Sequence, residues 1–97
     1  MIRRDPQAAY RNLKQRVRDN AFRYSQAAFV MMVDRLLYEE DVKRAVATST
    51  LAGTFEDGRG RTLFILHGFG MNEDAVAVVC RFDRTRVEVV DVFRLAE

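Results

Sequence analysis

Arginine is the side chain whose abundance in this sequence suggests chemistry. Of the 16 basic residues, 14 are arginines and only two are lysines. The guanidinium group is a planar fork that binds a phosphate or a carboxylate through two parallel hydrogen bonds. Arginine content can also reflect genome base composition, and charged side chains on strands are commonly solvated. The arginines therefore have two interpretations, an anion-binding surface or an ordinary charged exterior.

His67 is the only histidine. It ends an apolar segment and precedes Gly68, a position from which an imidazole could reach a cleft and titrate near neutral pH. The string Phe64–Gly70 is similar to the His-Gly oxyanion loop of α/β-hydrolases, but the sequence lacks the Gly-x-Ser-x-Gly turn that carries their nucleophile. A structural or merely exposed His67 is the simpler interpretation, and a functional one stays open.

Cys80 is the only cysteine, so an intramolecular disulfide is excluded. It ends the apolar run Val76–Val79, where a free cysteine packs as a small hydrophobe. One histidine and one cysteine are too few donors for a metal site, and the two Gly-x-Gly pairs lack the rest of a nucleotide-binding loop. We therefore expect no metal and no cofactor.

Three acidic residues stand in succession, Glu39, Glu40 and Asp41. Paired carboxylates can perform acid–base catalysis when they face one cleft with different pKa values. At the start of a predicted helix, however, the helix macrodipole is a sufficient explanation for three adjacent acids. We expect these residues to stabilise the helix start.

The chain has 97 residues, of which 48% are hydrophobic and 31% charged. This length and composition predict one folded domain spanning 1–97 and exclude a large multidomain enzyme or a disordered segment. The apolar runs are far shorter than the roughly 18 residues of a membrane span. No apolar signal segment follows the first residues. We expect a cytoplasmic protein without a membrane contact.

Helical signals occupy the first half of the sequence. Asp5 and Pro6 are typical of a helix start, and apolar residues then recur at helical spacing, which predicts a basic helix over about 5–20. Further helices are expected over about 25–47, with Ser25 as an N-cap. From about 51 to 95 the residues alternate as in strands joined by short turns. The sequence predicts an α+β fold, two to three N-terminal helices packed on a four-stranded antiparallel sheet.

The last predicted strand, Arg86–Arg94, places valines on both of its faces. Val87 and Val89 share one face, whereas Val90 and Val92 share the other. Either both faces of the strand are buried or a bulge shifts the alternation. The sequence alone leaves these two alternatives open.

The segment Tyr24–Val42 resembles bacterial domain-of-unknown-function family 4258, whose pattern is S-x-H-A…R-M-x-x-R-G-I-[ST]-x-x-D-V. The residues that carry the resemblance are Tyr24-Ser25-Gln26-Ala27-Ala28, Met32, Arg35, Leu37 and Glu40-Asp41-Val42. This family is similar to the RelE, ParE and BrnT toxins, small α/β proteins with helices before an antiparallel sheet. Ala27 replaces the family's histidine, Leu36 its glycine and Tyr38 its Ser/Thr cap, so the resemblance implies the fold more than an activity.

RelE-type toxins act on ribosome-bound messenger RNA largely through basic side chains on the sheet face. The resemblance therefore implies a small bacterial toxin-like module of a toxin–antitoxin pair that binds RNA and acts on translation. The RNA contacts that it implies on the strands and turns are Arg61, Arg81, Arg84, Arg86 and Arg94.

Cleavage of the RNA, if it occurs, would be a metal-independent attack by the RNA's own 2′-hydroxyl. His67 or Arg81 would assist this attack, so these two residues are the candidate catalytic groups. Phe69 and Phe93 could stack on bases.

The formal net charge of +2 is unevenly distributed. Residues 1–24 carry seven basic and two acidic side chains, whereas residues 25–97 carry nine basic and twelve acidic ones. A basic amphipathic helix therefore precedes a mildly acidic remainder. We expect this helix to contact a nucleic acid, an acidic partner or the body of the domain, through Arg11, Lys14 and Arg18.

A second function class is a non-catalytic protein-interaction domain on the same scaffold. The helix that begins near Ser25 is apolar over a wider arc than packing on one core requires, which makes Phe29, Val30 and Met31 the expected interface. The partner would be a second copy of the chain, an antitoxin or another protein. The absent family histidine favours this class, and the resemblance favours the RNA-directed class.

Overall fold

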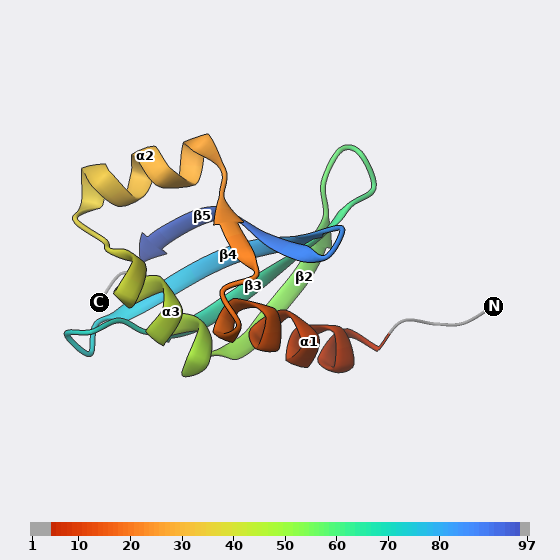
Figure 1. Cartoon of the computed structure of the whole chain (residues 1–97), viewed down its shortest axis with the longest axis horizontal. Coiled ribbons are helices and arrows are strands. Elements are labelled where there is room, and N and C mark those ends of the chain that lie inside the picture. Colours follow the sequence, from red (N-terminus) through yellow and green to blue (C-terminus); the bar gives the residue numbers. More distant parts are fainter. Residues whose placement is uncertain (1–4, 96–97) are drawn as a thin grey trace.

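The computed structural model describes residues 5–95, which form three helices and one five-stranded sheet. The helices are α1 (Pro6–Arg18), α2 (Gln26–Arg35) and α3 (Glu39–Ala47). The strands are β1 (Phe22–Tyr24), β2 (Thr50–Glu56), β3 (Thr62–Phe69), β4 (Ala75–Asp83) and β5 (Arg86–Arg94), in the spatial order β1-β5-β4-β3-β2. Figure 1 shows α1 and α3 lying across the strands and α2 along the end of the sheet formed by β5 and β1. The α+β class is confirmed.

The predicted four-stranded antiparallel sheet is wrong in one respect, because β1 adds a fifth strand parallel to β5. Phe22 lies opposite Val87, and Tyr24 lies opposite Val89. The backbone N–H of Val87 donates to the Ala21 carbonyl at 3.0 Å, which extends the pairing by one residue. Three residues are too few to show the alternation by which strands are recognised, so β1 has almost no sequence signal.

The predicted helix starts are confirmed by their capping hydrogen bonds. The Asp5 side chain accepts from the backbone N–H of Gln7 at 3.0 Å, and the Ser25 hydroxyl oxygen accepts from that of Ala28 at 3.0 Å. The first helix ends at Arg18, two residues before the predicted position, and Asn20 then takes a positive φ of 63°. None of the helices within 5–95 is long and apolar enough to cross a membrane.

The bulge in β5 resolves the valine pattern of that strand. Val79 of β4 lies opposite Asp91, and the next residue, Cys80, lies opposite Val89, so that Val90 is an extra residue in β5. The alternation shifts at this point, and Val87, Val89 and Val92 all become fully buried. The core lies between these valines, the inward residues of β3 and β4, and the helices.

Helix α1 packs through an apolar stripe and two polar contacts. Its residues Tyr10, Leu13 and Val17 are buried. The Tyr10 hydroxyl donates to the backbone carbonyl of Ser49, just after α3, at 2.6 Å. The guanidinium of Arg16 lies 4.8 Å from the ring centroid of Phe82. Helix α1 is thereby fixed against both α3 and the sheet.

Helix α3 approaches β3 more closely than any side chain at position 68 would allow. A Cβ atom on Gly68 would lie 1.9 Å from the backbone carbonyl oxygen of Ala45. The start of α3 is also tied to the loop after β3, because the buried Asp41 carboxylate accepts from the backbone N–H groups of Tyr38 at 3.0 Å and Met71 at 2.8 Å. The acidic start of α3 is thus structural, and Asp41 contributes hydrogen bonds in addition to its charge.

The contact at Gly68 predicts a large loss of stability for Gly68→Ala. Backbone atoms of Ala45 cannot move aside as a flexible side chain would, so we expect a loss of about 3 kcal/mol in the free energy of unfolding, measured by urea denaturation. Gly58→Ala is the matched control, because nothing lies within 4 Å of a Cβ there. Equal stabilities of the two variants would contradict the close packing of α3 on β3.

Candidate nucleic-acid interface

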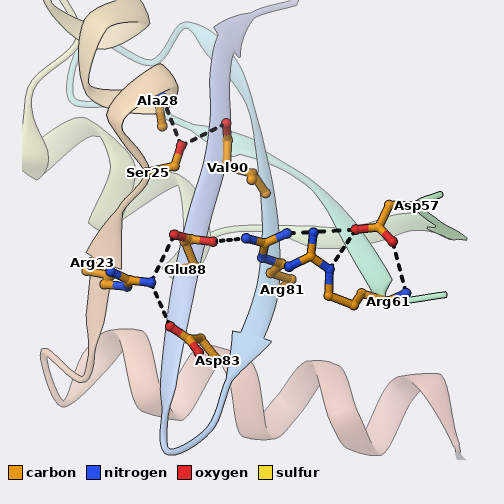
Figure 2. Close-up of polar contacts among 9 residues, drawn as sticks. All are labelled: Arg23, Ser25, Ala28, Asp57, Arg61, Arg81, Asp83, Glu88 and Val90. Carbon is orange, nitrogen blue, oxygen red and sulfur yellow. Dashed lines mark hydrogen bonds and ion pairs between the residues drawn. The ribbon is translucent and has the colours of Figure 1, made fainter. Parts of the chain in front are cut away.

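The face of the sheet opposite the helices carries a chain of alternating charges (Figure 2). Glu88 of β5 lies between Arg81 of β4 and Arg23 of β1 and forms ion pairs with both. Arg23 also contacts Asp83 at 2.8 Å. The Glu88 side chain is only 8% exposed. A carboxylate so buried needs its cationic partners, so Arg23 and Arg81 have a structural task.

Asp57, in the turn between β2 and β3, extends this chain of charges. Its carboxylate contacts Arg61 Nε at 2.9 Å and Arg81 Nη1 at 3.8 Å. It also accepts from the backbone N–H groups of Arg61 at 3.0 Å and Arg59 at 2.8 Å. The hydrogen bond from the Arg61 backbone is the largest cause that lowers the pKa of Asp57, followed by that from Arg59. Arg61 and Arg81 are therefore already neutralised within the protein.

Arg94 is also held within the protein. Its Nε lies 2.8 Å from Asp74, and its guanidinium donates to the carbonyl of Arg35 at the end of α2. Arg84 and Arg86, at the β4–β5 turn, form no ion pair with residues 5–95. Of the five arginines expected on the strands and turns, only these two keep an unneutralised charge within the described chain.

The two candidate catalytic residues are not brought together. His67 is exposed and lies opposite Ala77, whereas Arg81 is four residues further along β4. This separates them by about 13 Å along the strand direction. Cys80 is fully buried on the opposite face, and burial raises the pKa of its thiol to about 12, as expected for an inert core residue. Among residues 5–95, the groups in contact with Arg81 are the carboxylates of Glu88 and Asp57, and His67 is not one of them.

A groove between α1 and α3 gathers positive charge. It encloses about 330 Å³, and its apolar lining residues are Val17, Val46 and Ala47. Its four cationic side chains are Lys14, Arg18, Lys43 and Arg44. We call this feature the α1–α3 groove.

Few acceptors inside the protein compete for these four cations. Lys14 lies 5.2 Å from the ring centroid of Tyr10, and Lys14 and Arg18 form no ion pair with residues 5–95. The ammonium of Lys43 donates to the neutral Asn20 side chain at 2.7 Å. Within residues 5–95, Arg44 is the one cation of the groove that pairs with a carboxylate, that of Glu73 at 2.6 Å. The groove therefore has a strong excess of positive charge.

Sequence reasoning identified one wall of this groove and missed the other. Lys14 and Arg18 were expected to bind an anion, and Arg11 lies one turn before Lys14 on the same stripe of α1. Lys43 and Arg44 follow the acidic start of α3, where their charges suggest only a balanced helix. The packing of α1 on α3 is what brings the two pairs together, and no local signal predicts it.

The remaining predicted contacts lie elsewhere on the surface. Phe29 and Val30 are exposed on α2, and Met31 is half-buried. Phe69 is 48% exposed at the end of β3, and Phe93 of β5 is half-buried. The described residues contain no group of three or more potential metal-ligating side chains.

Comparison with protein-family models, with curated proteins and with solved structures finds no significant match for this chain. The resemblance of Tyr24–Val42 to the toxin-related family therefore stays a prediction. The site has to be argued from its own geometry, which favours the α1–α3 groove over the sheet face.

The ion pairs of Glu88 predict unequal effects of two arginine substitutions. Arg81→Ala leaves the buried carboxylate with Arg23 alone, so we expect a loss of about 2 kcal/mol in the free energy of unfolding. Arg61→Ala removes an exposed partner of Asp57 and should cost about 0.5 kcal/mol. Urea denaturation measures both. A loss for Arg81→Ala as small as the one expected for Arg61→Ala would mean that Arg81 is not required by the fold and is free for a ligand.

Proposed function

We propose that this protein is a small RNA-directed module that acts on translation, and that the α1–α3 groove contacts the phosphate backbone of the RNA. The observation that carries the proposal is the gathering of Lys14, Arg18, Lys43 and Arg44 around one cavity with a single carboxylate, that of Glu73. Such an excess of fixed positive charge attracts a polyanion more strongly than it attracts a neutral ligand.

The choice of RNA rests on two further points. Residues 1–24 carry seven basic side chains against two acidic ones, and Lys14 and Arg18 of this segment line the groove. The resemblance to the toxin-related family supports a messenger RNA bound on the ribosome. Arg11 on α1 would extend the contact to neighbouring phosphates, because it lies one helical turn from Lys14.

Binding is better supported than cleavage. His67 and Arg81 lie about 13 Å apart along the sheet, and Arg81 is occupied by Glu88 and Asp57. An RNA held in the α1–α3 groove would not need either residue. The proposal is therefore that translation is blocked by occupancy of the RNA.

A protein-interaction domain remains the second candidate function. The exposed apolar side chains of α2, which include Phe29 and Val30, favour it. An antitoxin or a second copy of the chain would cover them. This candidate does not exclude the first, because α2 contributes no side chain to the α1–α3 groove.

The proposal predicts salt-dependent binding of single-stranded RNA through the groove. The double variant Lys14→Ala/Arg18→Ala should bind a fluorescently labelled RNA of mixed sequence at least tenfold more weakly, as measured by fluorescence anisotropy. The slope of log K against log salt concentration should fall by about 1.4 in magnitude, about 0.7 for each lost phosphate contact on a single strand.

Arg59→Ala is the control for this measurement. Arg59 lies exposed in the β2–β3 turn and forms no ion pair with residues 5–95, so its loss removes one positive charge without affecting the groove. Equal affinity losses in Arg59→Ala and in each single groove variant would reduce the effect to net charge. Unchanged affinity in the double variant would exclude the groove as the RNA site.

The effect on translation predicts slower growth of bacterial cells that express the protein. Lys14→Ala/Arg18→Ala should restore growth at equal expression, whereas His67→Ala should leave the arrest in place, because His67 lies outside the groove. Relief by His67→Ala, with unchanged affinity for RNA, would replace the binding mechanism by cleavage. Normal growth with the unmodified protein would remove the translation-directed function and favour the interaction domain.

A further inference from the structure

Helix α2 exposes an apolar face that no described element covers. Five large side chains of α2 and the segment after it are more than half exposed: Phe29 57%, Val30 56%, Val33 62%, Leu36 67% and Tyr38 62%. Only Ala28 and Met32 of this helix are buried, against the β5–β1 side of the sheet. We call these five residues the α2 face.

A groove runs beside the α2 face. It encloses about 320 Å³ and is lined by four residues of the α2 face together with Tyr24, Met32, Leu37 and Glu39. The Tyr24 hydroxyl is buried and forms no hydrogen bond within the described chain. Burial raises the pKa of Tyr24 well above its usual range, and the charges of Glu39 and Glu40 raise it further. Tyr24 is therefore neutral at physiological pH, so it adds no charge to this groove.

The area of the α2 face matches the centre of a protein–protein interface. Its two aromatic and three aliphatic side chains expose on the order of 500 Å², given about 150–250 Å² for a whole aromatic residue. This area lies toward the upper end of the range found for the largest apolar patch on a typical monomer. A standard interface covers about 800 Å² per partner. A covering partner would therefore bury this face together with a polar rim.

We propose that a second copy of this chain covers the α2 face, with the two α2 helices packed antiparallel about a two-fold axis at Val30. The spacing of residues on the helix makes this arrangement self-complementary. Val30 would contact Val30 of the other copy. Val33 lies three positions after Val30 and Ala27 three positions before it, so Val33 of each copy would lie over the small Ala27 of the other. A large residue thus faces a small one on both sides of the axis.

The charges of α2 are complementary in the same arrangement. Asp34 is exposed and forms no ion pair with residues 5–95, and the first turn of α2 contains no acidic residue. Asp34 lies four positions after Val30, and Gln26 lies four positions before it. Each Asp34 would therefore lie beside Gln26 of the other copy, at the positive N-terminal end of its helix. This reciprocity is a property of two identical helices, which is why we choose a second copy over an unrelated partner.

Solution mass measurements test the proposal directly. Light scattering after size-exclusion chromatography at increasing protein concentrations should give a mass that approaches twice the 11.2 kDa of one chain. Val30→Asp places two carboxylates on the axis and should give a monomer. Phe69→Asp is the matched control, because Phe69 is 48% exposed but lies on β3, outside the α2 face, and it should leave the dimer intact.

Cross-linking tests the position of the axis. Val30→Cys should form an intermolecular disulfide under mild oxidation, because the two thiols would meet at the axis. Val33→Cys should form it much more slowly, since each thiol would face Ala27 instead of its own copy. Cys80 does not interfere, because it is buried. Circular dichroism of each variant tests whether it is folded.

Three outcomes would overturn the proposal. The first is a monomer at all concentrations, and the second is a dimer that survives Val30→Asp or is lost in Phe69→Asp. Faster cross-linking through Val33→Cys than through Val30→Cys would also exclude the proposed axis. None of these measurements depends on RNA binding, so the dimer and the RNA-directed function stand or fall separately.

Discussion

The close approach of α3 to β3 is the constraint on which the rest of the structure depends. Gly68 lets the backbone of Ala45 lie against the strand, and this contact sets the height of α3 above the sheet. Helix α1 then takes its position from α3, because Tyr10 donates to the carbonyl of Ser49 at 2.6 Å. The α1–α3 groove is a consequence of this packing. Two of its four cations lie on α1 and the other two on α3, so they come together only because the two helices pack side by side.

The cationic side chains on the two sides of the sheet differ in whether a carboxylate of the protein neutralises them. On the side without helices, the burial of Glu88 requires Arg23 and Arg81 to neutralise it, and Asp57 binds Arg61. An arginine that is neutralised by a buried carboxylate gains little by binding a phosphate, because it would leave that carboxylate unpaired. On the side of the helices, cations face a groove with one carboxylate. Lys14, Arg18 and Lys43, which form no ion pair with residues 5–95, therefore gather where α1 meets α3, and Arg84 and Arg86 at the β4–β5 turn are the unneutralised arginines of the strands.

Local sequence signals predicted the helix starts and the inward residues. They failed for features that depend on pairing between strands distant in the sequence. Asp5 and Ser25 cap their helices as expected, because a cap depends on backbone groups two or three residues away. Strand β1 was missed, because its identity comes from parallel pairing with β5 and not from its three residues. The valines of β5 left two alternatives, and only the register with β4 showed the bulge at Val90.

The sequence by itself determined the α+β class, the order of helices before hairpin-linked strands and the burial of Cys80, because these follow from spacing and hydrophobicity along a short stretch of chain. The tertiary structure alone decided which charges are available. Arg23 and Asp83 are 60 positions apart in the chain, yet their side chains are in contact. Lys14 and Lys43 likewise line one groove only because two helices pack together. The charge that a residue presents to a ligand depends on its neighbours in space, and a linear pattern does not contain them.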